Sequence, residues 1–168
     1  MPFSAEQLNA MNRLHFKDYF YVVVQSVLFA VFIAFQLYPQ EFLPAIALPE
    51  PLRTVGLGMV FLGSFCILIA LLQLSERLSP FPTPKANARL LQNGLFKYVR
   101  HPIYSGLILA FIGWSLRNES PEQLAVSLLL WLLFWFKSRY EEKRLLDYFP
   151  GYSDYRKKTG RFWPKWGK

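Results

Sequence analysis

Two long stretches without a charged side chain limit what this chain can fold into. Tyr19–Tyr38 and Thr54–Ser75 contain no Asp, Glu, Lys or Arg. The first has 20 residues, and at about 1.5 Å per residue a helix of that length crosses the roughly 30 Å hydrocarbon core of a bilayer. Both stretches therefore predict transmembrane helices.

Two shorter apolar segments, Ile103–Leu116 and Gln123–Phe136, follow later in the chain, and Arg117–Glu122 joins them as a tight turn. Pro102 suits the first position of the third helix, because its missing N–H needs no partner there. A connection this short makes the third and fourth helices antiparallel neighbours. The fourth helix is expected to continue as a polar helix until Pro150–Gly151 stops it.

Prolines mark two of the connections. Residues 39–51 are expected to form a stiff loop, and residues 76–93 an extended polar loop. We therefore predict an all-α integral membrane protein with about four transmembrane helices and a helical or irregular cytosolic C-terminal tail. Residues 1–168 would form one membrane domain, in which residues 1–75 hold an N-terminal arm and two helices. Residues 76–168 would hold the loop, the helical hairpin and the tail.

Basic residues gather in three parts of the chain. Two of the 19 Lys and Arg residues lie in residues 1–17, five in 75–102 and ten in 137–168, whereas 39–53 and 117–122 hold one each. If four helices cross the membrane, the positive-inside rule places both termini in the cytoplasm. The net charge of +8 then belongs to one membrane face, so we expect membrane lipids and no nucleic acid as partners. The single cysteine excludes a disulfide framework or a Cys-based metal site, and we predict no metal.

The stretch Gly94–Gly106 gathers polar side chains directly before the third predicted helix. Arg100 and His101 would lie at the positive end of the helix dipole, at the edge of the bilayer. Donors grouped at a helix N-terminus suit an anionic group such as a carboxylate or a phosphate. We therefore expect this stretch to form part of a binding site.

An acid pair, Glu141-Glu142, lies near the end of the fourth predicted helix. Since the third and fourth helices are antiparallel, the acid pair and the Arg100-His101 turn should face each other across a few ångströms on the cytoplasmic side. Ionisable residues at the membrane boundary are functional candidates.

Plainer interpretations remain open for each group. His101 could simply cap the third helix. Glu141 and Glu142 could form a solvated face that pairs with Arg139, Arg144 or Lys137. The basic and aromatic tail, residues 152–168, is interpreted as a membrane anchor rather than as part of a site.

Several motifs together resemble those of one family. They are Gly94-Leu95-Phe96, then Arg100-His101-Pro102-Ile103-Tyr104-Ser105-Gly106, Glu141-Glu142 with Leu145, Tyr152 with Tyr155, and Arg161-Phe162 with Pro164. This combination resembles the isoprenylcysteine carboxyl methyltransferase family and is similar to the related membrane phospholipid N-methyltransferases. It covers roughly the last 90 residues, and the first two helices match only in character. Arg-His-Pro-x-Tyr alone would be weak, but the later acid pair makes the combination fairly specific.

The resemblance implies an integral membrane enzyme that uses S-adenosylmethionine at the cytoplasmic face. A lipophilic acceptor, either a lipid, a small molecule or a lipidated partner, would reach it from the bilayer. The loop within residues 76–168 would belong to the cofactor site. The cofactor-binding residues it implies are Gly94, Leu95, Arg100, His101, Pro102, Tyr104, Gly106, Glu141 and Glu142.

Two residues are expected to act on the acceptor. Arg139 could orient an anionic acceptor by paired N–H groups, as could Arg144. Glu142 could remove a proton from an amine or thiol acceptor, whereas a carboxylate acceptor needs no base. The sequence leaves the acceptor open among these three classes.

Two other functions compete with methyl transfer. A membrane NADPH-dependent reductase of the sterol-reductase kind has a similar C-terminal motif, but tends to carry Asn where Ile103 stands and lacks the Glu-Glu pair, so we favour methyl transfer. A non-catalytic membrane adaptor would need no buried polar residues at the start of the third helix.

Overall fold

The computed structural model describes residues 15–38, 43–44, 47–74 and 90–165. Within these residues the secondary structure is helical, which confirms the predicted all-α class. The elements are α2 (Phe16–Leu37), α3 (Glu50–Leu74), the short 3-10 helix η2 (Gly94–Lys97), α4 (Pro102–Arg117), α5 (Pro121–Tyr148) and α6 (Tyr152–Lys158). The predictions for the N-terminal arm and for most of the 76–93 loop concern residues outside this part of the chain.

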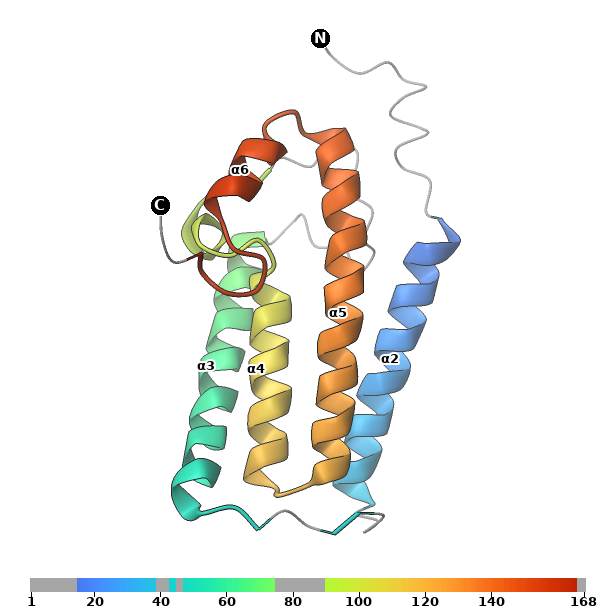
Figure 1. Ribbon diagram of the computed structural model, residues 1–168, viewed down its shortest axis with the longest axis vertical. Helices are drawn as coiled ribbons and strands as arrows, with labels where there is room; N and C mark the ends of the chain where they lie inside the picture. Colours follow the sequence, from blue (N-terminus) through green and yellow to red (C-terminus); the bar gives the residue numbers. More distant parts are fainter. Residues whose placement is uncertain (1–14, 39–42, 45–46, 75–89, 166–168) are drawn as a thin grey trace.

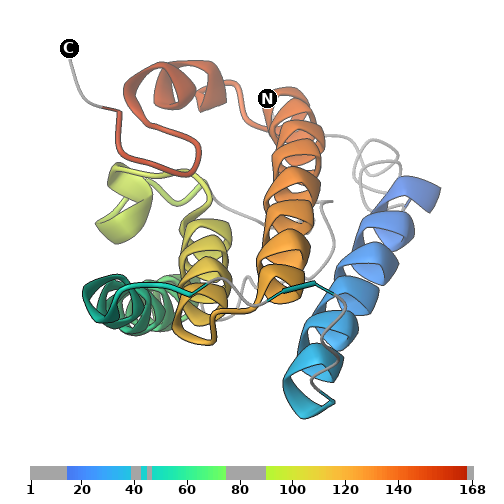
Figure 2. The same cartoon turned by 60° about the horizontal axis from the view of Figure 1, so that its bottom comes forward.

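The four long helices lie side by side in one bundle (Figures 1 and 2). Both views show α4 between α3 and α5, with α2 beside α5. The end of α3, the start of α4 and the end of α5 lie at the same end of the bundle as α6 (Figure 1). The predicted antiparallel hairpin of the third and fourth helices is therefore confirmed, and its motifs meet at one end.

The outside of the bundle is apolar. Helices α2 and α3 are each long and apolar enough to cross a membrane. Large apolar side chains on these two helices are exposed, among them Val23, Val27, Phe61, Phe65 and Leu68. An extended apolar surface of this kind suits the hydrocarbon of a lipid bilayer and not water.

Two helices begin earlier than the charge pattern predicted. Helix α2 starts at Phe16 because the Asp18 carboxylate accepts a hydrogen bond from the His15 backbone N–H at 2.7 Å and fixes the first turn. Helix α3 starts at Glu50, so Pro51 lies in a helix and not in the predicted loop. Proline is tolerated in the first turn, where no backbone N–H donates within the helix.

Two pairs of glycines bring α3 and α4 into close contact. A Cβ atom added to Gly63 would lie 2.5 Å from the Gly106 carbonyl oxygen, and one added to Gly56 would lie 2.6 Å from that of Gly113. Such distances leave no space for a side chain, so the two backbones pack directly against each other. Gly56 and Gly63 of α3 therefore serve helix packing.

The apolar core lies between α2, α4 and α5, and the C-terminal segment contributes to it. Its buried members are Phe32, Ile108, Val126, Leu130, Phe134 and Phe162. Phe162 follows α6, so the segment after α6 folds back onto the bundle. This return of the chain brings tail residues to the start of α4.

Candidate functional site

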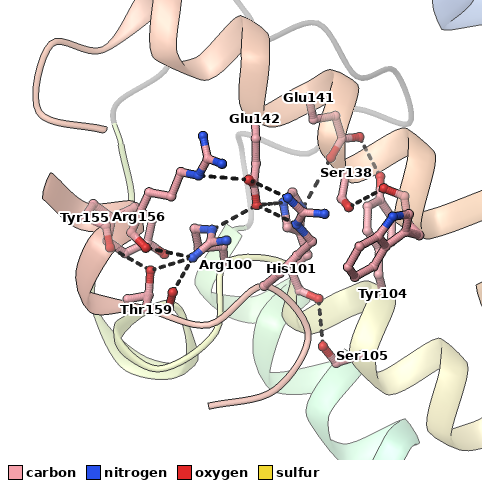
Figure 3. A network of polar contacts seen from close by, with 12 residues as sticks. Arg100, His101, Tyr104, Ser105, Ser138, Glu141, Glu142, Tyr155, Arg156 and Thr159 are labelled. Carbon is pink, nitrogen blue, oxygen red and sulfur yellow. Dashed lines mark hydrogen bonds and ion pairs between the residues drawn. The ribbon is translucent and has the colours of Figure 1, made fainter. Parts of the chain in front are cut away.

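Glu142, on α5, is the centre of a buried ionic cluster (Figure 3). Its side chain is only 2% exposed, and it contacts Arg100 Nε at 2.9 Å. Arg161 donates to both carboxylate oxygens, from Nε and from Nη2, at 3.1 Å each. His101 Nε2 lies 3.3 Å from Oε1. One carboxylate therefore holds groups from the turn before α4 and from the segment after α6.

Backbone hydrogen bonds explain why Arg100 and Arg161 meet. The N–H of Arg100 donates to the Gly160 carbonyl at 2.9 Å, and that of His101 donates to the Arg161 carbonyl at 3.1 Å. The Ser105 hydroxyl adds a bond of 2.6 Å to the Phe162 carbonyl. The chain after α6 thus runs along the turn before α4 and covers it.

The same contacts correct the interpretation of the tail. Arg100 Nη1 donates to the backbone carbonyls of Thr159 and Arg156, and the Tyr155 hydroxyl donates to the Phe96 carbonyl at 2.6 Å. Residues 152–162 therefore form part of the cluster and its support. Interpreting this part only as a membrane anchor was wrong, because Arg156 and Arg161 contact Glu142 and the three aromatic rings of this segment are buried.

The second acid, Glu141, is joined to the cluster through an aromatic stack. Its carboxylate accepts a hydrogen bond of 2.6 Å from the Tyr104 hydroxyl and lies 3.4 Å from His101 Nδ1. The Tyr104 ring stacks on His101 at a centroid distance of 5.5 Å and on Phe134 at 4.6 Å. His101 is thus held between the two acids and one aromatic ring.

These contacts decide between the interpretations that the sequence left open. His101 occupies the N-cap position of α4 but makes no side-chain capping bond, since its imidazole faces the acids instead. Glu142 is buried and paired with residues from other elements, so it is not part of a solvated face. The predicted meeting of the Arg100-His101 turn with the acid pair is confirmed.

Contacts within the cluster shift the pKa values of His101 and Glu142. Both residues lie outside the apolar segments of α4 and α5. Burial alone would lower the pKa of His101, but hydrogen bonds and charge interactions with Glu141 and Glu142 outweigh burial and raise it. Burial alone would raise the pKa of Glu142, but His101, Arg161 and Arg100 hold it well below its usual range. His101 therefore favours its protonated form beside an ionised Glu142.

Gly94 and Leu95 connect η2 to the end of α3. Gly94 has φ of +59°, and a Cβ atom there would collide with the Gln73 side chain, so the position requires glycine. The Leu95 N–H donates to Gln73 Oε1 at 3.0 Å. The backbone predicted to contact a cofactor thus packs against α3, and one of its amides is used within the protein.

The other three predicted site residues are Pro102, Gly106 and Arg139. Pro102 is the first residue of α4, as expected. Gly106 packs against Gly63 of α3, so its surroundings are a helix contact and not the polar cluster. Arg139 is exposed on α5 and makes no hydrogen bond or ion pair within the part of the chain that the structure describes. We therefore leave Gly106 and Arg139 out of the site.

Sequence reasoning missed Arg161, Thr159 and Lys137 as members of the site or its surroundings. Arg161 did belong to one of the motifs that carried the resemblance, and this was the signal that could have identified it. Thr159 carries no such signal, because Arg100 Nη1 donates to its backbone carbonyl and reaches its hydroxyl oxygen only at 3.4 Å. Lys137 was assigned only a possible surface pairing, although the structure buries it.

Comparisons with known proteins find a solved structure of similar fold and a family to which the chain belongs. The structure is similar to that of the eukaryotic intramembrane Ras methyltransferase ICMT (isoprenylcysteine carboxyl methyltransferase), with a TM-score of 0.63 and 22% sequence identity, over 96% of this chain and 57% of that chain. An identity this low shows the fold alone. The fold and its apolar exterior therefore define an integral membrane protein built as a helical bundle.

Sequence comparisons identify the family. The family model described as phospholipid methyltransferase matches residues 52–150, which is more than half of the chain, and the chain belongs to this family. Two relatives are named protein-S-isoprenylcysteine O-methyltransferase. The one from Schizosaccharomyces pombe is 33% identical over 64% of this chain and 47% of its own length. The one from Saccharomyces cerevisiae is 30% identical over 74% of this chain and 54% of its own length. The chain thus spans about half the length of these relatives.

Proposed function

We propose that this protein is a membrane methyltransferase that uses S-adenosylmethionine and methylates a lipophilic acceptor, as the names of its relatives suggest. The observation that carries the proposal is the buried Glu142 carboxylate with Arg100, His101 and Arg161 around it. A non-catalytic adaptor would not need such a cluster, because burying charges costs free energy that apolar packing would avoid. The family membership favours methyl transfer over reduction by NADPH.

The cluster offers the groups that S-adenosylmethionine would need. His101 Nε2 is buried and faces Glu142 Oε1 at 3.3 Å, without a well-aligned hydrogen bond within the described residues. Cations at Arg100, His101 and Arg161 suit the carboxylate of the methyl donor. The Glu141 carboxylate suits its ammonium group or ribose hydroxyls. When bound, the donor supplies an electrophilic methyl group on a sulfonium.

The two acids would have different tasks. Glu142 is held ionised by four cationic side chains, those of Arg100, His101, Arg156 and Arg161. It is therefore a weak proton acceptor, and we propose that it positions Arg100, His101 and Arg161. Glu141 contacts only His101 and Tyr104 in the cluster and remains available to bind. This division modifies the expectation that Glu142 acts as a base.

Exclusion of water is the second contribution of the protein. The segment after α6 covers His101 and Glu142, and Arg161 also lies over the Trp135 ring with its guanidinium 4.8 Å from the ring centroid. In a dry site, fixed charges interact more strongly than they do in water. We propose that this segment keeps the reacting groups aligned and protected.

We also propose the membrane topology. Four helices would cross the bilayer as one domain, with both termini and the cluster on the cytoplasmic side. The distribution of Lys and Arg supports this orientation. Labelling of single cysteines introduced at Lys157 and at Arg53, in a Cys66→Ser background and in intact cells, would test it. A reagent that cannot cross the membrane should reach only the position at Arg53.

A methyl-transfer screen tests the activity itself. Purified protein is incubated with S-adenosylmethionine that carries a radiolabelled methyl group, together with membrane lipids, prenylated cysteine derivatives and small thiols. We expect label to pass to a lipophilic compound with the wild type and not with His101→Ala or Glu142→Ala. Asp147→Asn, an exposed change on the same helix, is the control that should retain transfer.

A further inference from the structure

Tyr152, the first residue of α6, carries a buried hydroxyl that the fold does not use. Its side chain is 1% exposed, and its hydroxyl oxygen has no hydrogen-bond partner within the part of the chain that the structure describes. Burying a hydroxyl without a partner costs free energy that a phenylalanine at the same place would not cost. Because buried polar atoms are nearly always hydrogen-bonded, this one requires an explanation, and a bound ligand that completes it is one.

Tyr155, on the same helix, shows what a purely structural tyrosine does. The two rings meet edge to face, with their centroids 5.8 Å apart. The Tyr155 hydroxyl donates to the Phe96 carbonyl at 2.6 Å and so fastens α6 to η2. The ring of Tyr152 also packs in this corner, but a phenylalanine ring would pack equally well. Its hydroxyl is therefore the part of the side chain that structure alone does not account for.

Helix α6 places Tyr152 next to the charge cluster. Arg156 follows it by four residues and so lies on the same helix face. From this face Arg156 Nε reaches Glu142 at 3.6 Å, and the Arg156 carbonyl accepts a hydrogen bond of 3.1 Å from Arg100 Nη1 (Figure 3). The charges of Glu142 and Arg100 both act on the Tyr152 hydroxyl, which therefore lies within their reach.

The hydroxyl stays protonated in these surroundings and can donate. Burial raises the pKa of Tyr152, the negative charge of Glu142 raises it further, and Arg100 opposes the shift only in part. A phenol donates one hydrogen bond, and the bond is strongest when the acceptor is an anion. In S-adenosylmethionine the anionic group is the carboxylate, which the cations of the cluster also suit.

We propose that the Tyr152 hydroxyl binds the carboxylate of S-adenosylmethionine, together with the cations around Glu142. This inference rests on the proposed function and adds a binding residue from α6 to it. Since Tyr152 and Glu142 are both enclosed, α6 has to shift when the donor enters. The new hydrogen bond then holds α6 over the bound carboxylate, which gives the C-terminal part of the chain a role in binding besides the exclusion of water.

The binding test removes the hydroxyl and keeps the ring, in Tyr152→Phe. Affinity for S-adenosylmethionine is measured by isothermal titration on purified full-length protein in lipid nanodiscs. We expect the variant to bind about tenfold more weakly than the wild type, because a hydrogen bond to a carboxylate is lost. Decarboxylated S-adenosylmethionine, which lacks this carboxylate, should bind both proteins equally. Tyr98→Phe makes the same change at an exposed tyrosine and should behave as the wild type with both ligands.

Thermal midpoints without a ligand provide a second readout, in which the two tyrosines of α6 should differ. Tyr152→Phe should be at least as stable as the wild type, because it removes a buried hydroxyl that has no partner. Tyr155→Phe should be less stable, because it loses the hydrogen bond to the Phe96 carbonyl.

Three results would overturn the assignment of Tyr152 alone, each with a wild type that binds S-adenosylmethionine. The first is an unchanged donor affinity in Tyr152→Phe. The second is an equal loss for both ligands, which would place the hydroxyl at another part of the donor. The third is a lower midpoint of ligand-free Tyr152→Phe, which would show that an enclosed water already satisfies the hydroxyl. A wild type that does not bind S-adenosylmethionine would instead overturn the proposed function.

Discussion

Arg161 and Glu142 form a paired contact, with two hydrogen bonds of 3.1 Å between the guanidinium and the carboxylate. The two residues lie on different elements, one on α5 and one in the segment after α6. Since Glu142 also holds Arg100 and His101, the cluster is complete only when the C-terminal segment has folded back. The tail is therefore part of the site and not an appendage.

Replacing Arg161 with Gln should weaken binding of S-adenosylmethionine by about tenfold. A hydrogen bond to a charged group contributes about 1.5–3 kcal/mol, and its loss also loosens the cover over the site. Isothermal titration of the purified variant measures the change. Lys157→Gln is the matched control, since Lys157 is exposed and pairs with Asp154 within α6. An equal loss in both variants would show that Arg161 has no special role.

Glu142→Gln should destabilise the protein by about 3–5 kcal/mol, because it leaves several buried cations without their carboxylate. The exposed Asp147→Asn, on the same helix, should stay within about 0.5 kcal/mol of the wild type. Denaturant unfolding in detergent micelles, followed by tryptophan fluorescence, measures both. Similar stability of the two variants would mean that the cluster does not hold the fold together.

The contribution of His101 to stability should depend on pH in a defined direction. Its pKa is raised above the usual 6.5 by the two acids, so its stabilising ion pairs are fully present below that pH and are lost as the pH rises through the raised pKa. Glu142 behaves in the opposite way, since its pKa lies below the usual 4.5, and its contribution is lost only in acid. Near neutral pH both contributions are present.

We therefore expect the difference in unfolding free energy between the wild type and His101→Gln to be larger near about pH 6 than near about pH 9. Unfolding curves of the two proteins at these pH values provide the measurement. A difference that does not change with pH would indicate that His101 is neutral in the folded protein.

Gly63→Val should prevent close packing of α3 on α4, because its Cβ atom would lie 2.5 Å from the Gly106 carbonyl. Overpacking costs about 1–3 kcal/mol or more, and here the obstacle is backbone. Gly58→Val on the same helix is the control, since a Cβ atom at Gly58 meets nothing within 4 Å. The thermal midpoints of the two variants in detergent should differ, and equal midpoints would exclude this packing role.

Much of the fold could be predicted because charge and proline patterns are local. Uncharged stretches located α2 and α3, and the short turn at Arg117–Glu122 made α4 and α5 antiparallel neighbours. The charge pattern does not predict the start of α2 at Phe16, because this start depends on the contact between Asp18 and His15. In the sequence, the charge of Asp18 only indicates the end of an uncharged stretch. The proline pattern of residues 39–51 predicts a loop that includes Pro51, although the first turn of a helix tolerates proline.

The site could be predicted in part. Helix direction was enough to bring His101 and Tyr104 to the acid pair, since the two sets lie at the ends of neighbouring helices. The places of Arg161 and Lys137 could not be predicted in this way. Arg161 depends on the return of the chain after α6, and Lys137 depends on which side of α5 faces α2. From composition alone, both residues are interpreted as ordinary cations at the membrane surface.

The buried cluster around Glu142 is proposed to bind a methyl donor. Isothermal titration of the purified protein in nanodiscs with S-adenosylmethionine and, separately, with NADPH tests it most directly. We predict saturable binding of S-adenosylmethionine that His101→Ala and Glu142→Ala each weaken while the protein stays folded, and no binding of NADPH. Saturable binding of NADPH without binding of S-adenosylmethionine, or donor affinity unchanged in both variants, would contradict it.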